Sequence, residues 1–169
     1  MPASTRRPSP QPSHLDARGR ARMVDVSAKA ETYREAVAMG DVHMNAAARR
    51  AVRTHAVKKG DPLQAARLAG IMAAKKTSDI IPLCHPLPLS HVGVEIQPRA
   101  YGYRLVARVA TVGRTGVEME ALVAVSAAAL TLYDMLKAVD RAIVIDRVCL
   151  LEKRGGKSGP YRRAGLPGR

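Results

Sequence analysis

The longest uncharged apolar stretch of the chain lies in its second half, at residues 121–133. Small and apolar side chains occupy nearly every face that a helix would present here, which is typical of a helix packed on several sides. Thr115 and Glu118 have the spacing of a capping box, so we expect the helix to start there. Because charged residues bound the run on both sides, it is too short to cross a bilayer. The pattern therefore predicts a central buried helix within residues 115–140.

Alternating apolar and polar positions predict strands before and after this helix. Apolar side chains at every second position of 92–97 indicate a half-buried strand, and a second strand is expected at 103–111 after a turn. The short connection should make this pair an antiparallel hairpin. We also predict an early strand at 33–44 and a last, mostly buried strand at 142–151, which is rich in β-branched residues.

Two helices are predicted between the early strand and the hairpin. Asn45 is placed to cap a helix at 46–57. Asp61 precedes a proline and should cap a second helix at 62–76, with Gln64 completing the capping box. One face of this second helix carries only small residues, so it can pack closely against a sheet or another helix.

Residues 77–90 follow and contain three prolines. Proline removes a backbone donor and fixes φ, so this segment is predicted to be ordered without being helix or strand. It is apolar and holds Cys84 and His85, which means that it must pack against other parts of the chain. Rigid irregular backbone of this kind is a candidate binding loop.

Together these elements predict an α+β sandwich in which helices cover one face of a mainly antiparallel sheet. At 169 residues the chain should form one domain. Residues 1–22 are rich in proline, serine and arginine and are predicted to be a disordered basic extension. The basic end at 160–169 is predicted to be a flexible tail.

The net charge of +14 is concentrated at the two ends of the chain. Residues 1–22 hold five arginines and one aspartate, whereas 150–169 hold six lysines and arginines and one glutamate. The central part is only mildly basic, which suits an anionic small substrate at least as well as DNA. The chain has no Trp or Phe, so aromatic platforms for single-stranded bases would be hard to build.

Cys84 and Cys149 are the two cysteines, and they are far apart without a CxxC pattern. This usage favours free thiols in a reducing compartment, and we expect a cytoplasmic protein. The spacing of Cys84, His85 and His91 does not match a zinc site, so no metal is expected. His85 is better suited to contacting phosphate or carrying a proton.

The charged residues of the central helix lie at its two ends. Asp134 and Lys137 are three residues apart and so share a helix face, either as an ordinary ion pair or as a buried pair that tunes a general acid or base. Glu120 either complements the helix dipole or accepts hydrogen bonds from a substrate. Glu120 and Asp134 would be roughly 21 Å apart along one helix. If both serve one small site, a neighbouring subunit must bring the two ends together.

Lys153 and Lys157 flank a glycine-rich stretch that resembles a phosphate loop at first sight. The P-loop pattern fails because Leu151 stands where a glycine is needed and Pro160 blocks the following helix. A generic anion-binding loop after the last strand is still compatible with the sequence.

Six blocks of the chain carry a resemblance to a known family. They are Lys59-Gly60-Asp61, Ala69 to Thr77, Ile81 to Leu87, Thr115 to Leu122, Tyr133 to Ala138 and Gly155 to Gly159. Taken in order, these blocks resemble the MoaC family of cyclic pyranopterin monophosphate synthases, which act in molybdenum cofactor biosynthesis. The resemblance covers about residues 23–159 and implies a catalytic domain there with a ferredoxin-like α+β fold.

The resemblance implies that (8S)-3′,8-cyclo-7,8-dihydroguanosine 5′-triphosphate is converted to cyclic pyranopterin monophosphate and pyrophosphate. It implies Asp134, Lys59 and Lys137 as catalytic residues. Substrate binding is implied for Leu83, Cys84, His85, Met119, Glu120, Arg34, Lys75, Lys153 and Lys157. No metal or organic cofactor is implied.

The resemblance also implies a homohexamer, built as a trimer of dimers, with active sites between subunits. The resemblance further implies a functional link to the radical enzyme that makes the substrate. Neither nucleic acid nor a membrane is expected as a partner. Two alternatives remain from the residues themselves: a basic nucleic-acid-binding module, and a non-catalytic assembly partner with the same fold.

Overall fold

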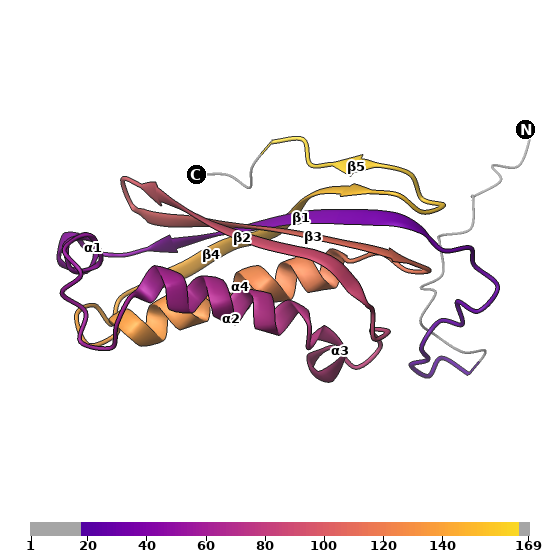
Figure 1. The fold of residues 1–169 in the computed structure, drawn as a ribbon, viewed down its shortest axis with the longest axis horizontal. Coiled ribbons are helices and arrows are strands. Elements are labelled where there is room, and N and C mark those ends of the chain that lie inside the picture. Colours follow the sequence, from indigo (N-terminus) through magenta and orange to yellow (C-terminus); the bar gives the residue numbers. More distant parts are fainter. Residues whose placement is uncertain (1–17, 166–169) are drawn as a thin grey trace, which may run out of the picture.

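The structure, a computed structural model, describes residues 18–165. Their strands form one five-stranded antiparallel sheet in the order β2-β3-β1-β4-β5, and α2 and α4 lie on one face of it (Figure 1). In chain order the elements are β1 (Thr32–His43), α1 (Ala46–Arg53), α2 (Pro62–Ala74), α3 (Thr77–Ile80), β2 (Leu89–Arg99), β3 (Gly102–Gly113), α4 (Glu118–Leu136), β4 (Val144–Arg154) and β5 (Tyr161–Arg162).

The predicted α+β class is confirmed, and so is the β2–β3 hairpin. The central strand β1 pairs with β3 along its whole length and with β4 on its other edge. The ferredoxin-like description stays a prediction, which the β-α-β-β-α-β succession of β1 to β4 supports.

The helix layer depends on small residues, as the sequence predicted. Ala66, Gly70 and Ala74 are the buried positions of α2 after Pro62, and they recur every fourth residue. A Cβ atom on Gly70 would lie only 2.8 Å from the carbonyl oxygen of Ala124 in α4. The backbones of the two helices can therefore come into close contact. Helix α4 also packs on β1, β3 and β4.

Helix α4 is the central helix that the apolar pattern predicted. By length and composition alone it could cross a membrane, a test that core helices of soluble proteins also pass. Here its buried residues, which include Ala121, Val125 and Leu132, pack into the hydrophobic core between sheet and α2. Its remaining positions are half-buried, apart from Leu130 and Asp134, which are exposed.

The predicted capping box at the start of α4 is wrong. The helix begins at Glu118, and the residue at its N-cap is Val117, which makes no side-chain cap. The Thr115 hydroxyl donates to the carbonyl oxygen of Gly116 instead. Glu118 forms an ion pair with Lys153 of β4. Its side chain therefore makes a tertiary contact and does not cap the helix.

The two predicted caps at Asn45 and Asp61 are confirmed, although both helices end earlier than expected. Asn45 accepts a hydrogen bond from the amide of Ala48, but α1 ends at Arg53 and not at residue 57. Asp61 accepts from the amides of the second and third residues of α2. Gln64 does not complete the box, because its side chain accepts a hydrogen bond from Arg67.

Three predictions about the irregular and terminal parts also need correction. The loop at 77–90 contains the one-turn helix α3 and the first residues of β2. Strand β4 is mostly half-buried, with Cys149 its one buried residue among those described. Beyond it, Tyr161 and Arg162 form β5 and pair with β4, although a flexible tail was predicted from residue 160 onward. The predicted extension at 1–22 lies largely outside the described residues.

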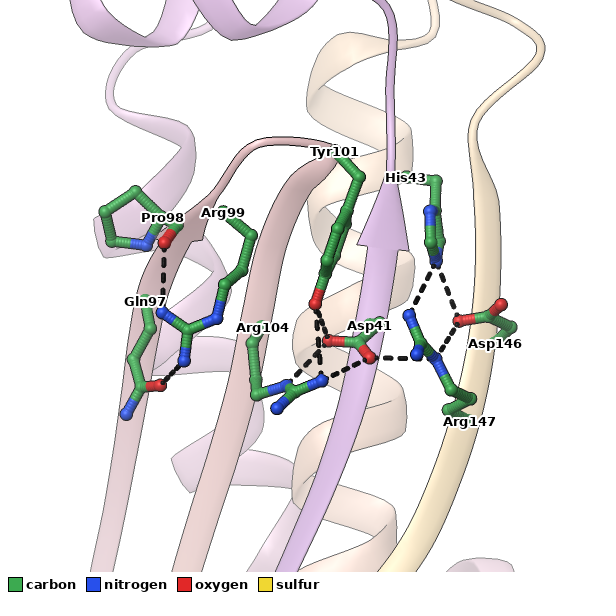
Figure 2. Close-up of polar contacts among 9 residues, drawn as sticks. All are labelled: Asp41, His43, Gln97, Pro98, Arg99, Tyr101, Arg104, Asp146 and Arg147. Carbon is green, nitrogen blue, oxygen red and sulfur yellow. Dashed lines mark hydrogen bonds and ion pairs between the residues drawn. The ribbon is translucent and has the colours of Figure 1, made fainter. Parts of the chain in front are cut away.

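A buried charged network supports the sheet at the His43 end of β1. Figure 2 shows Asp41 held between Arg104, which reaches both of its carboxylate oxygens, and Arg147. The Tyr101 hydroxyl also donates to Asp41 at 2.6 Å. Burial acts to raise the pKa of Asp41, but the hydrogen bonds from Arg104 and Tyr101 outweigh it, and the pKa lies below its ordinary value. None of these residues is among the predicted site residues.

Candidate active site

The predicted site residues gather in two places, at opposite ends of α4. The N-terminal end meets two adjoining cavities and a small recess, which together are lined by nine of the twelve residues: Arg34, Lys75, Leu83, Cys84, His85, Met119, Glu120, Lys153 and Lys157. The C-terminal end carries the other three, Lys59, Asp134 and Lys137.

A cavity of about 340 Å³ opens beside Glu120. Its walls include Leu83, Cys84, His85, Met119 and Glu120, so the proline-rich loop and the first turn of α4 face each other as expected. A small recess of about 60 Å³ next to it is lined by Lys75, His85 and Glu120, among others. We call the larger space the Glu120 cavity.

Glu120 is 3 % exposed, although it belongs to the first turn of a helix. Burial raises the pKa of this carboxyl to about 7, and the neighbouring charge of Glu118 acts in the same direction. The Cys84 thiol has a raised pKa for the same main reason, burial, and Glu120 adds to it. At neutral pH Glu120 can therefore both donate and accept a proton or a hydrogen bond.

A second cavity, of about 730 Å³, lies between the start of β1 and the end of β4. It is strongly basic, and we call it the basic cavity. Its cationic side chains are Lys29, Arg34, Arg114, Lys153, Arg154 and Lys157, against two glutamates, Glu35 and Glu118.

The basic side chains of this cavity are positioned by contacts from several elements. The Arg34 side chain donates to the carbonyl oxygen of Gly113 at 2.8 Å. Lys153 contacts Glu118 at 3.1 Å and donates to the Ser158 hydroxyl at 2.8 Å. Gly156 has φ +78, and a Cβ there would lie 2.2 Å from the Arg34 guanidinium, so only glycine lets the turn close over this side chain.

At the far end of α4, Asp134 is held between two lysines. Lys137 Nζ and Lys59 Nζ each lie 2.8 Å from a different oxygen of its carboxylate. Lys59 also donates to the backbone carbonyl of Asp134 at 3.0 Å. The chain thus brings together the three residues that the family resemblance marked as catalytic, from α4 and from the turn before α2.

Of the two alternatives for Asp134 and Lys137, the single chain shows the exposed ion pair and not the buried pair. The side chains of Lys59, Asp134 and Lys137 are each about half exposed. Hydrogen bonds from Lys137 and then Lys59 lower the pKa of Asp134 to about 2. The hydrogen bond to Asp134 in turn raises the pKa of Lys137. The cluster at neutral pH is one carboxylate between two ammonium groups.

Sequence reasoning missed several residues that line the cavities. Val24, Val26 and Lys29, from the segment before β1, contribute walls, as does Arg114. The alternation of Val24 and Val26 marks that segment as extended, but nothing local indicates which surface it covers. Within residues 18–165 no group of three His, Cys, Asp or Glu side chains could hold a metal ion.

The fold and the two cavities define an α+β protein with a strongly basic cavity beside a buried carboxyl group. The family model described as the MoaC family matches residues 23–156, and the chain belongs to this family.

Three similar proteins share one name. The chain is 58 % identical over 153 residues to the cyclic pyranopterin monophosphate synthase of Thermomicrobium roseum, a match that covers 89 % of this chain and 92 % of the relative. The protein of that name from Novosphingobium aromaticivorans is 55 % identical, over 90 % of this chain and 97 % of its own length. The one from Nostoc sp. is 56 % identical, over 88 % and 90 %.

Proposed function

We propose that this chain is a lyase that makes cyclic pyranopterin monophosphate in molybdenum cofactor biosynthesis. The observation that carries the proposal is the extent of the similarity, since relatives with this activity in their name are 55–58 % identical over about nine-tenths of the chain. The substrate would be (8S)-3′,8-cyclo-7,8-dihydroguanosine 5′-triphosphate, and pyrophosphate would be the second product.

The two cavities match the two halves of such a substrate. A guanine-derived ring has N–H donors, and the buried Glu120 carboxyl beside Cys84 and His85 offers an acceptor for them. A triphosphate carries several negative charges, and the basic cavity presents Arg34, Lys153 and Lys157. We infer that the ring enters the Glu120 cavity and the terminal phosphates enter the basic cavity.

Formation of the cyclic phosphate requires a hydroxyl oxygen of the sugar-derived skeleton to attack the α-phosphorus. The bond from this phosphorus to the bridging oxygen breaks, pyrophosphate leaves with the bonding electron pair, and the hydroxyl proton must be taken up. Cationic side chains that face the phosphates stabilise the charge that develops on the leaving group. Ring opening and re-closing add proton transfers, for which Glu120 has a suitable pKa near 7.

Asp134, Lys59 and Lys137 are the proposed catalytic residues. Because Asp134 is ionised at neutral pH, its role in the free chain is to orient the two lysines and keep Lys137 protonated. Lys137 is then a proton donor or an electrostatic stabiliser, and Lys59 is a second cation at the same place. The structure supports this reading through the two short contacts to opposite carboxylate oxygens.

We further propose that a second copy of the chain completes each site. Met119, Val123, Leu130, Asp134 and Lys137 fall on one helical face of α4 by their spacing. Leu130 in the middle of that face is 62 % exposed. An antiparallel α4 from another copy, laid along this apolar stripe, would bring its Asp134 and Lys137 next to Met119 and Glu120. A hexamer built as a trimer of dimers is the expected assembly.

The enzyme should act in the cytoplasm. It would catalyse the step that follows a radical enzyme, which rearranges GTP into the substrate. The decisive experiment is turnover of enzymatically prepared substrate by the wild type and by Asp134→Asn, followed by chromatography of product and pyrophosphate. The wild type should form both products, and the variant should bind substrate but stall. No product from a folded wild type would overturn the proposal and make nucleic-acid binding by the basic ends the next property to test.

A further inference from the structure

The segment before β1 forms part of both cavities at the N-terminal end of α4. Figure 1 shows this part of the chain in indigo, next to the end of the sheet at which β1 begins. Val24 and Val26 line the Glu120 cavity, and Lys29 lines both the Glu120 cavity and the basic cavity. None of these residues was assigned to the site by its sequence.

Local contacts hold the segment in this shape. The Ser27 amide donates to the Asp25 carboxylate at 2.9 Å, and the Lys29 amide donates to the carbonyl oxygen of Val26 at 3.0 Å. Glu31 lies 3.6 Å from Arg114. The turn at 27–29 thereby presents Lys29 at the wall that the two cavities share.

The ammonium group of Lys29 has no acidic partner within residues 18–165. Asp25 is engaged with Ser27, and this hydrogen bond holds the pKa of Asp25 below its ordinary value. Glu118, which also lines both cavities, is paired with Lys153. Glu31 faces Arg114. A cation in this position is available to bind an anion from the ligand.

We propose that Lys29 binds the α-phosphoryl group of the substrate. The residues that line both cavities are Lys29, Thr115, Gly116 and Glu118, and Lys29 is the one cation among them. With a ring in one cavity and terminal phosphates in the other, the α-phosphate lies where the cavities meet. The inference rests on the proposed function, because it uses the order of groups in that substrate.

The position gives Lys29 a role that differs from those of Lys153 and Lys157. The α-phosphorus is the atom that is attacked, and negative charge moves from its oxygens to the departing pyrophosphate as the bond breaks. A lysine at this phosphoryl group stabilises the reacting atoms, whereas cations deeper in the basic cavity hold the leaving group. Loss of Lys29 should therefore affect turnover more than it affects binding of free pyrophosphate.

The test compares Lys29→Gln with Lys29→Arg, in the full-length enzyme with prepared substrate. Lys29→Gln should lower kcat by about 100-fold, the lower end of the range for loss of one stabilising donor at the reacting group. Lys29→Arg should retain kcat within about threefold, because it keeps the charge. Arg50→Gln, an exposed arginine of α1, is the charge-matched control and should behave like the wild type.

Inhibition by pyrophosphate separates the α-phosphate from the terminal phosphates. The inhibition constant for pyrophosphate should be nearly unchanged in Lys29→Gln and should rise several-fold in Lys157→Gln. A parallel loss of pyrophosphate binding in Lys29→Gln would overturn the assignment to the α-phosphoryl group.

Three further outcomes are decisive. An active wild type with an equally active Lys29→Gln would overturn this inference and leave the proposed function standing, whereas an inactive folded wild type would overturn both. If Lys29→Gln loses activity with a lowered melting temperature and Lys29→Arg does not restore it, Lys29 has a structural role and the inference is wrong.

Discussion

At the scale of single residues, the two ends of α4 shift their carboxyl groups in opposite directions. Burial raises the pKa of Glu120 to about 7, whereas two lysines lower the pKa of Asp134 to about 2. The sequence left open whether Asp134 and Lys137 form a buried pair tuned to neutrality. Of these two carboxyl groups, Glu120 is the one whose pKa lies near neutral in the single chain, because the first turn of α4 is buried against the sheet and the loop.

The pKa of Glu120 predicts a pH dependence of stability. Its folded pKa lies above the unfolded one, so the native state holds more protons between these values and stability falls as pH rises through this range. A rise from 4.5 to about 7 corresponds to a loss of about 3 kcal/mol, at about 1.4 kcal/mol per pKa unit. Urea unfolding at pH 5 and pH 8, at fixed protein concentration, measures this loss.

Glu120→Gln is the control for that measurement. The variant keeps the shape and cannot ionise, so the difference between pH 5 and pH 8 should shrink by most of this amount. An unchanged difference would show that another group accounts for the pH dependence.

Asp41 predicts the opposite pH behaviour. Its folded pKa lies below the unfolded one, so its contribution to stability is present above the unfolded pKa and is lost as pH falls through the folded pKa. Asp41→Asn leaves two arginines facing each other and should cost about 3 kcal/mol at pH 7, with a smaller cost at pH 3. Asp146→Asn, at the exposed rim of the network, should cost about 1 kcal/mol or less. Thermal unfolding of both variants at the two pH values is the check.

At the scale of elements, the contact between α2 and α4 depends on one missing side chain. Alanine normally stabilises a helix over glycine by up to about 1 kcal/mol. At Gly70 the added Cβ would meet a backbone carbonyl at 2.8 Å and Val94 at 3.1 Å, so the helices would have to separate. Gly70→Ala should therefore destabilise the protein by about 1–3 kcal/mol in urea unfolding.

Leu68→Ala is the matched change on the same helix. Leu68 is 59 % exposed, so its truncation should alter the free energy of unfolding by about 0.5 kcal/mol or less. A stabilising effect of Gly70→Ala would mean that the two helices can move apart without loss of packing.

Elements whose signals are local were predictable from the sequence, and those that need a distant partner were not. The caps at Asn45 and Asp61 use neighbouring amides and are correct. The cap at Thr115 failed because Glu118 is used by Lys153, thirty-five residues later in the chain. Strand β5 exists by pairing with β4, and its two residues carry no strand pattern of their own.

The site was predictable to the same extent. The blocks that resemble the MoaC family identified the site residues. The distance between Glu120 and Asp134 along α4 predicted that these residues would form two groups. Their burial could not be derived, because Glu120 is buried by the loop at 83–87 and Asp134 is left exposed in one chain. The role of Lys29 as a wall of both cavities also follows only from the tertiary structure.

At the scale of the whole molecule, the proposal that two copies share each site predicts complementation. Glu120→Ala and Asp134→Asn should each be inactive alone. Refolded together, they should regain a substantial part of wild-type activity, because a mixed pair of subunits contains one site in which neither residue is changed. Turnover of the mixture, with each variant refolded alone as the control, provides the measurement.

A mixture as inactive as its components, although mixed oligomers form, would show that each site takes both residues from one chain. Size-exclusion chromatography with differently tagged variants establishes whether mixed oligomers are present.

The central place of β1 in the sheet also determines how the protein can fold. Glu35 pairs with Ala110 on one side and with Arg154 on the other, so both ladders of this strand close over long stretches of chain. Pairings so distant in sequence slow folding to the range of milliseconds to seconds. During synthesis β1 is also the first of the long strands to leave the ribosome. Its edge toward β3 can pair once residues 102–113 have emerged, whereas its edge toward β4 stays open until residues 144–154 have been made. Chaperones that shield exposed strand edges should therefore raise the yield of this protein more than its modest size suggests.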